Sequence, residues 1–286
     1  LPQELQSDAS LLSYPVPDMD RLRQLVEEVH RETAGDDAAE LPGDLREAFA
    51  RAVVGLIERE ALRVLRRAAI SSGGLNHNCL PEVIAQKRQA VRKSGVLEFI
   101  EPNVDFQSVG GLERLKQWFR SRRRAFSPEG RRFGLRSPRG AVLVGVPGCG
   151  KSLSAKALAA DWQVPLLRLD MGRLRGSLMG ESERRLRRAL ETAELAAPCV
   201  LWIDELEKAF AGLGQSHDSG VGQRMFGQFL TWLSDRHQPV FVVATANDIT
   251  RLPPEFTRKG RFDEMFFVGL PNEQERRAIW EIHLKR

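Results

Sequence analysis

The chain has 286 residues, a formal net charge of +5, and 42% hydrophobic and 28% charged residues. This length allows one or two domains with a sizeable core, and the composition is ordinary for a globular protein. The sequence lacks an apolar run of the roughly 20 residues that span a membrane, and it lacks a secretory signal. Its three cysteines, Cys79, Cys149 and Cys199, are isolated and odd in number, which predicts a reducing compartment without disulfides. Because the chain begins with leucine rather than methionine, we expect it to be a fragment.

Residues 1–95 are predicted to form a small helical bundle. Apolar residues recur at helical spacing from Asp18 to His30, and similar patterns cover segments near 45–53, 61–69 and 81–94. The pair Gly73-Gly74 predicts the end of the third helix. None of these segments carries an obvious site.

From about residue 104 onward, short apolar runs alternate with helical patterns. Such alternation is typical of a parallel sheet that is covered by helices on both faces. A glycine- and serine-rich stretch, Gly212 to Gly222, is predicted to be mobile. The five predicted strands are Ala141–Val144, Leu166–Leu169, Val200–Ile203, Phe241–Thr245 and Met265–Val268.

Residues 145–152 have the sequence GVPGCGKS, which fits a phosphate-binding loop at every constrained position. The loop lies between a predicted strand and a predicted helix from Leu153 to Trp162. Its glycines allow backbone N–H groups to turn toward phosphate oxygens, and a helix N-terminus favours negative charge. Lys151 would then reach the β- and γ-phosphates, and the Ser152 hydroxyl would ligate Mg²⁺. The alternative is an ordinary glycine-rich turn.

Polar side chains follow two of the predicted buried strands. Asp204 and Glu205 come directly after one of them, where Asp204 can hold Mg²⁺ through its water shell and Glu205 can activate a water molecule. The alternative is a strand that leads into an acidic helix start. Asn247 follows another strand and could bind the γ-phosphate or the attacking water, although such an Asn is more often a turn residue.

Two arginines, Arg258 and Arg261, flank the glycine turn at Gly260. Guanidinium groups that a neighbouring subunit presents can neutralise charge on a phosphoryl group during its transfer. The alternative is a basic surface loop.

Together these motifs resemble those of the AAA+ ATPases with a second region of homology. The motifs are GVPGCGKS at 145–152, LWIDE at 201–205, ATAN at 244–247 and PPEFTRKGRFD at 253–263. The resemblance covers roughly residues 99–286. It implies an α/β P-loop NTPase core with a five-stranded parallel sheet flanked by helices, preceded by a small helical lid-like domain. It also implies ATP or ADP and Mg²⁺ as cofactors, and a homo-hexameric ring.

The same resemblance implies the roles of individual residues. Residues 106–112, FQSVGGL, are similar to the segment with which the family embraces adenine. Catalytic roles are implied for Glu205, Asn247, Arg258 and Arg261, with the two arginines acting in trans, and Mg²⁺ binding for Ser152 and Asp204. The implied nucleotide-binding residues are Val109, Gly110, Pro147, Gly148, Cys149, Gly150, Lys151, Ser152, Leu153 and Asp204.

The sequence around and between these motifs resembles an uncharacterised AAA+ family of cyanobacteria and algal plastids, which is named as a hypothetical chloroplast reading frame. That resemblance implies the cytoplasm or the plastid stroma as location. It also implies that residues 1–95 are the lid-like domain of a degenerate first module, 96–270 the ATPase core and 271–286 the start of a truncated second lid. A weak internal repeat in the sequence agrees with a degenerate first module. Residues 6–9, QSDA, occupy the place of that module's arginine fingers and contain no arginine.

Two positions depart from the wider family. Leu178, in the segment LMG at 178–180, replaces the aromatic residue with which unfoldases grip a chain. Cys149 replaces the usual threonine of the phosphate loop; it is either a tolerated small residue or a redox-sensitive brake on nucleotide binding.

The expected function is Mg²⁺-dependent ATP hydrolysis by a ring that remodels a protein partner. One alternative is a slow, nucleotide-switched scaffold or regulator, which Leu178 favours. Another is a nucleic-acid-binding AAA+ protein, because eight arginines lie between Arg120 and Arg139, although few aromatic residues are interleaved with them.

Overall fold

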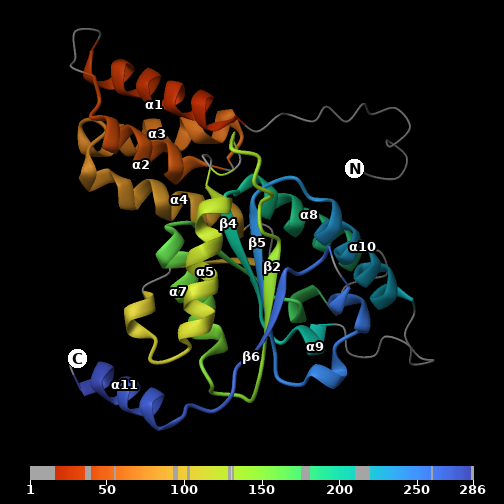
Figure 1. The fold of residues 1–286 in the computed structure, drawn as a ribbon. Coiled ribbons are helices and arrows are strands. Elements are labelled where there is room, and N and C mark those ends of the chain that lie inside the picture. Colours follow the sequence, from red (N-terminus) through yellow and green to blue (C-terminus); the bar gives the residue numbers. More distant parts are fainter. Residues whose placement is uncertain are drawn as a thin grey trace. The chain divides into compact units, whose positions relative to one another are not determined.

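The computed structural model describes residues 17–35, 40–54, 56–92, 96–101, 104–127, 130, 132–174, 181–209, 220–258 and 260–284. The chain forms two compact units, Leu1–Lys87 and Arg88–Arg286 (Figure 1). The division falls within one helix, and the three-part division at residues 95 and 270 stays a prediction.

The first unit is built from helices, as the apolar spacing predicts. They are α1 (Met19–Ala34), α2 (Gly43–Val53), α3 (Glu58–Ser72), the 3-10 turn η2 (His77–Cys79) and α4 (Leu80–Arg92), which continues into the second unit. Asp18 caps α1 by accepting a hydrogen bond from the Arg21 N–H at 2.8 Å. Gly73 ends α3 in a left-handed conformation with φ 68°, which confirms the predicted stop.

The apolar stripes of these helices form the core of the first unit. Leu25, Phe49 and Leu65, from α1, α2 and α3, are each fully buried. On the rim, ion pairs connect α1 to its neighbours: Arg23 to Glu47 at 2.7 Å and Arg66 to Glu32 at 2.7 Å.

The second unit is a six-stranded sheet in the order β1-β3-β4-β5-β2-β6. The strands are β1 (Leu97–Ile100), β2 (Gly140–Val144), β3 (Leu166–Leu169), β4 (Cys199–Ile203), β5 (Val240–Ala246) and β6 (Glu264–Phe267). The five predicted strands are confirmed, and they pair in parallel. The sixth, β1, pairs antiparallel with β3 at the edge of the sheet and was not predicted.

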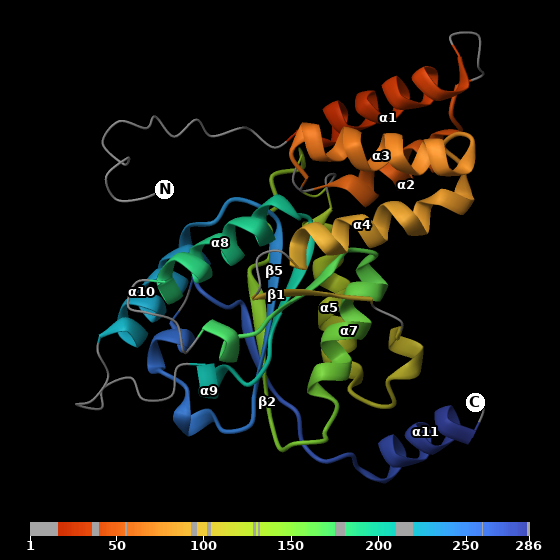
Figure 2. The same cartoon turned by 180° about the vertical axis from the view of Figure 1, so that it is seen from behind.

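Helices cover both faces of this sheet. Figures 1 and 2 show α5 and α7 on one face and α8 and α10 on the other. The α-helices are α5 (Glu113–Phe126), α7 (Lys151–Trp162), α8 (Glu181–Leu195), α9 (Leu206–Ala209), α10 (Val221–Asp235) and α11 (Glu273–Leu284). Short 3-10 turns are η3 (Phe106–Ser108), η4 (Gly172–Leu174), η5 (Ile249–Arg251) and η6 (Pro254–Thr257).

Alternation along the strands separates two hydrophobic cores. In β5, Phe241 and Val243 pack with α5 and α7, whereas Val242 and Ala244 pack on the opposite face with α8 and α10. Phe241 lies at the centre of an aromatic cluster with Trp118, Phe119, Phe126 and Trp162. These two cores hold β2, β4 and β5 side by side, so their carboxyl ends meet at one edge of the sheet.

Some predicted features lie outside the described residues: residues 6–9, residues 178–180 with Leu178, Arg131, and all of the Gly212–Gly222 stretch before Gly220. Among the described residues, none of the helices has the length and apolar character of a membrane span.

Candidate nucleotide-binding site

The loop between β2 and α7 has the backbone of an anion cradle. Gly148 and Gly150 adopt φ 84° and 95°, a left-handed conformation that side chains other than glycine rarely adopt. Gly150 is also the N-cap residue of α7, so the positive end of the helix dipole lies at the loop. This arrangement favours a phosphate group.

Lys151 lies at the start of α7 and is 7% exposed. Its Nζ donates to the backbone carbonyls of Gly145 at 2.7 Å and Val146 at 2.8 Å, and lies 3.7 Å from Sγ of Cys149. Among the described residues, no carboxylate lies within ion-pair distance of this ammonium group. A buried positive charge without a negative partner is costly, so an anion at this position would be stabilising.

Asp204, directly after β4, faces the start of α7. Its Oδ1 accepts hydrogen bonds from Ser152 Oγ at 3.5 Å and Thr245 Oγ1 at 2.6 Å. Its Oδ2 lies 3.6 Å from the Arg168 guanidinium, which also stacks over the ring of Trp202 at 5.2 Å. Side chains from three neighbouring elements, α7, β5 and β3, therefore contact this carboxylate beside the phosphate loop.

Ser152 and Asp204 are the pair that sequence analysis assigned to Mg²⁺, and their chemistry fits the ion. Both supply hard oxygen atoms, 3.5 Å apart. Among the described residues there is no group of three or more His, Cys, Asp or Glu side chains that could hold a metal by themselves. Mg²⁺ suits such a sparse site because it retains waters and shares phosphate oxygens.

Glu205 is held in an uncommon conformation beside Asp204. Its φ is 52°, in the left-handed region, and its N–H donates to Thr245 Oγ1 at 3.1 Å. Its Oε1 accepts from Asn247 Nδ2 at 3.2 Å and from Lys208 Nζ at 2.7 Å. The carboxylate of Glu205 raises the pKa of Lys208 through this hydrogen bond. The structure thus brings Glu205 and Asn247 together, as parallel neighbouring strands require.

Glu207 accepts a hydrogen bond from the backbone of Asn247, and its role was not predicted from the sequence. It is 4% exposed, and its Oε1 accepts from the Asn247 backbone N–H at 3.0 Å. Its Oε2 is buried without a hydrogen-bond partner among the described residues. Glu207 therefore fixes the backbone from which the Asn247 amide reaches Glu205.

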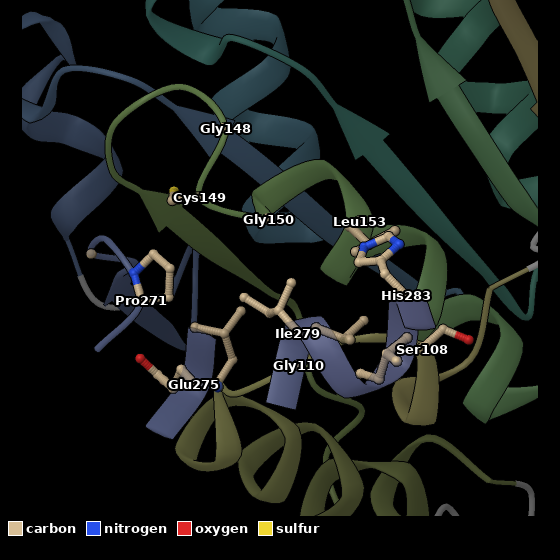
Figure 3. A pocket seen from close by; sticks show the side chains of 14 residues that line it. Ser108, Gly110, Gly148, Cys149, Gly150, Leu153, Pro271, Glu275, Ile279 and His283 are labelled. Atoms are coloured by element: carbon tan, nitrogen blue, oxygen red, sulfur yellow. Dashed lines mark hydrogen bonds between the residues drawn. The ribbon is translucent and has the colours of Figure 1, made fainter. Parts of the chain in front are cut away.

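A cavity of about 220 Å³ adjoins the phosphate loop. Figure 3 shows Leu153 from α7 and Ile279 and His283 from α11 around it. Of the predicted nucleotide-binding residues, the lining contains Val109, Gly110, Gly148, Cys149, Gly150 and Leu153. Pro147, Lys151, Ser152 and Asp204 are not part of this lining.

The helix α11 lies against the 108–112 segment through close backbone contact. A Cβ at Gly110 would meet Ile279 Cγ1 at 2.5 Å and Ile279 N at 2.8 Å. Glu275 connects the two elements, because its Oε1 accepts from the Leu112 N–H at 3.2 Å and its Oε2 from the Asn272 N–H at 2.9 Å. The cavity wall thus combines segments that are more than 160 residues apart along the chain.

Arg258 and Arg261 make no described contact with Asp204, Glu205 or Asn247. Arg258 is exposed after η6, and Arg261 donates through Nη1 to the carbonyl of Glu255. Within the described part of the chain, no ion pair connects either arginine to Asp204 or Glu205. Their predicted role in trans stays a prediction.

The comparison with known families agrees with this geometry. The family described as "ATPase family associated with various cellular activities (AAA)" matches residues 141–270. The chain belongs to the AAA ATPase family. A second family, described as "SpoVK-like AAA ATPase, second domain", matches residues 20–94. The predicted family and the α/β P-loop fold are therefore confirmed, and membership implies nucleotide binding.

Several relatives resemble this AAA protein along most of its length. The Uncharacterized AAA domain-containing protein ycf46 of Guillardia theta is 42% identical over 286 residues, 100% of this chain and 56% of that protein. Its namesake in Pyropia yezoensis is 47% identical over 246 residues, 86% of this chain and 50% of that protein. The ATPase family protein 2 homolog of Caenorhabditis elegans is 33% identical over 233 residues, 78% of this chain and 31% of that protein. The chain spans about half the length of the first two relatives.

Proposed function

We propose that this AAA protein binds ATP with Mg²⁺ and hydrolyses it in a homo-oligomeric, hexameric ring that remodels a protein partner. The observation that supports this most directly is Lys151, a buried ammonium group that lacks a carboxylate partner among the described residues. It lies beside a loop whose glycines and helix N-terminus favour phosphate.

Each residue of the site takes a part that its contacts support. Lys151 would bind phosphate oxygens, and Ser152 and Asp204 would hold Mg²⁺, which would neutralise charge on the phosphates. Glu205 accepts a proton from the attacking water, and Asn247, already bonded to Glu205 at 3.2 Å, orients both. Residues 108–112 and α11 enclose the base in the cavity of about 220 Å³.

Arg258 and Arg261 complete the site of the neighbouring subunit. Among the described residues, neither arginine forms an ion pair with Asp204 or Glu205 of its own chain, and Arg258 is exposed, which leaves its guanidinium available to a neighbouring subunit. An arginine supplied in trans contributes roughly 10³–10⁵-fold to turnover in other nucleotidases. Hydrolysis should therefore require assembly.

A second candidate function is a slow, nucleotide-switched scaffold. The pairing of the Glu205 carboxylate with Lys208 at 2.7 Å favours it, because an oxygen atom held by Lys208 is less free to turn toward a water molecule. The location implied by the resemblance, cytoplasm or plastid stroma, and the identity of the partner stay proposals.

The deciding experiment measures ATP hydrolysis against protein concentration, with Glu205→Gln as control. A steep rise in specific activity, absent in the control, supports an assembled ring. Mixing the Glu205→Gln chain with an Arg258→Ala/Arg261→Ala chain then tests the trans arrangement, since each chain supplies what the other lacks. Recovered activity in the mixture is expected; hydrolysis by a dilute monomer contradicts the proposal. Negligible turnover with tight ATP binding favours the scaffold.

A further inference from the structure

A second cavity, of about 510 Å³, lies at the amino ends of β2, β5 and β6, opposite to the phosphate loop. Four arginines line it, together with His237 and a single carboxylate. They are Arg122 from α5, Arg136 and Arg139 from the segment before β2, and Arg236 after α10; the carboxylate is Asp263. The positive charge of this lining exceeds its negative charge.

Two of the arginines have a structural task. Arg236 donates to the carbonyls of Leu233 at 2.8 Å and Val240 at 3.1 Å, and Arg139 also donates to Leu233 at 2.9 Å. They satisfy carbonyls at the C-terminus of α10 that have no partner within the helix. These bonds fix both guanidinium groups in place, but the carbonyl partners carry no negative charge.

The single carboxylate of this lining forms no ion pair with these guanidinium groups among the described residues. Oδ2 of Asp263 accepts from the backbone N–H groups of Arg139 at 2.6 Å and Gly140 at 2.9 Å. Among the described residues, no carboxylate pairs with any of the four guanidinium groups. Burial, together with the neighbouring charge of Arg139, lowers the pKa of Arg236 to about 10.

The other two arginines have no structural task of this kind. Arg136 is exposed and makes no hydrogen bond or ion pair within the described part of the chain. Arg122 stacks over the ring of Trp118 at 4.5 Å and donates only to Ser121 Oγ, at 3.1 Å. Stacking orients the Arg122 guanidinium at low entropic cost and leaves most of its N–H groups available.

We propose that this cavity binds a small anion of the phosphate class, such as a phosphate monoester or a diphosphate. Arg122 and Arg136 would form the bidentate contacts, and Arg139 and Arg236 would supply a fixed positive floor. A phosphate carries up to two charges and three acceptor oxygens, which several guanidinium groups can share. A ligand with only one carboxylate group would leave more of the positive charge of the four arginines uncompensated.

A small ligand fits better here than a nucleic acid. The guanidinium groups of Arg122 and Arg236 cover the rings of Trp118 and Trp232, at 4.5 Å and 4.8 Å. One face of each ring is therefore covered, although single-strand binders commonly use aromatic faces to stack on bases. The four guanidinium groups also gather around one concave cavity, which suits a small ligand.

Isothermal titration of the full chain with pyrophosphate, and separately with inorganic phosphate, tests the proposal. All chains carry Lys151→Ala, because the phosphate loop is itself expected to bind these probes. We expect the dissociation constant to rise roughly tenfold or more in Arg122→Gln/Arg136→Gln, since charge-assisted hydrogen bonds are lost. Arg187→Gln, which removes an exposed charge from α8, is the matched control and should leave it unchanged.

The outcomes separate the alternatives. If Arg122→Gln/Arg136→Gln binds pyrophosphate as tightly as the Lys151→Ala background does, the proposal is overturned. It is also overturned if Arg187→Gln loses as much affinity as the double variant. Malonate that binds as tightly as pyrophosphate overturns the phosphate assignment. Tight binding of an oligonucleotide through the same arginines, with a steep salt dependence, overturns the assignment to a small ligand. If circular dichroism shows that the double variant is unfolded, Arg136→Gln alone replaces it, because this exposed side chain makes no described contact.

Discussion

The side-chain amide of Asn247 donates to Oε1 of Glu205 at 3.2 Å and thereby joins the ends of β5 and β4. The backbone of Asn247 is fixed separately, by Glu207. The amide of Asn247 therefore holds the Glu205 carboxylate in one direction.

Replacing Asn247 with alanine should lower turnover about 10²-fold and change ADP affinity by less than about threefold, because the lost donor orients the base rather than the nucleotide. Steady-state hydrolysis and titration with a fluorescent ADP analogue measure the two quantities. A parallel loss of affinity and turnover would show that Asn247 acts mainly on the bound nucleotide.

Lys208→Ala should raise turnover severalfold if the Lys208–Glu205 pair, 2.7 Å long, restrains the carboxylate. The pair is partly exposed, so its loss should leave the free energy of unfolding almost unchanged. Stopped-flow phosphate release provides the rate, and thermal melting provides the control for stability. A fall in turnover would instead assign Lys208 a supporting role.

Gly110→Ala should weaken nucleotide binding roughly tenfold or more, because the new Cβ would displace α11 at Ile279 from the cavity wall. The matched control is Gly227→Ala in α10, where a Cβ meets nothing within 4 Å. That change should keep affinity and raise the unfolding free energy by up to about 1 kcal/mol. Binding that survives Gly110→Ala would mean that α11 does not enclose the base.

Arg168→Gln should lower the Mg²⁺ concentration for half-maximal hydrolysis about three- to tenfold. The guanidinium lies 3.6 Å from Asp204 and competes electrostatically with a cation there. Arg173→Gln, which breaks a nearby pair with Asp170, is the control and should have no effect. An increased Mg²⁺ requirement would indicate that Arg168 orients Asp204 rather than competing for it.

The helical unit should lose stability as pH falls through the acidic range. Arg66, Arg23 and Arg21 lower the pKa values of Glu32, Glu47 and Glu58 by hydrogen bonding. Because the folded pKa lies below the unfolded value of about 4.3, the stabilisation is complete above that pH and is lost as pH falls through the folded pKa.

Hydrogen exchange of α1 and α3 in the full chain, compared between pH 6 and pH 3.5 after correction for intrinsic rates, measures this loss. The variant Arg23→Gln/Arg66→Gln should show a flatter pH dependence. An unchanged slope would mean that other groups dominate the acid response.

Much of the candidate site could be predicted because its signals are local. The phosphate loop needs consecutive residues between one strand and one helix, and Asp204, Glu205 and Asn247 each end a buried strand. Thr245 and Arg168 could not be assigned in this way, because their roles come from strand pairing. Glu207 could not be assigned either, because its role comes from the contact of α9 with the residue after β5. Arg168 lies opposite Trp202, two residues before Asp204, only once β3 pairs with β4.

The strand β1 and the cavity wall were missed for a related reason. Leu97–Ile100 is short, and its pairing with β3 is antiparallel, so no helix-crossover pattern marks it. The contact of Gly110 with Ile279 joins segments far apart in the sequence, and only packing shows that Gly110 lacks room for a Cβ.

The hydroxyl of Thr245 has a single proton, and counting hydrogen bonds fixes its direction. It accepts from the Glu205 N–H at 3.1 Å and therefore gives its proton to Asp204 at 2.6 Å. Asp204 and Glu205 are thus both hydrogen-bonded to the same hydroxyl group, that of Thr245. For protein engineering, this means that a substitution at position 204 changes the hydrogen bonding of Glu205 through Thr245. A library that varies position 204 or 205 explores only part of a three-residue unit unless position 245 varies with them.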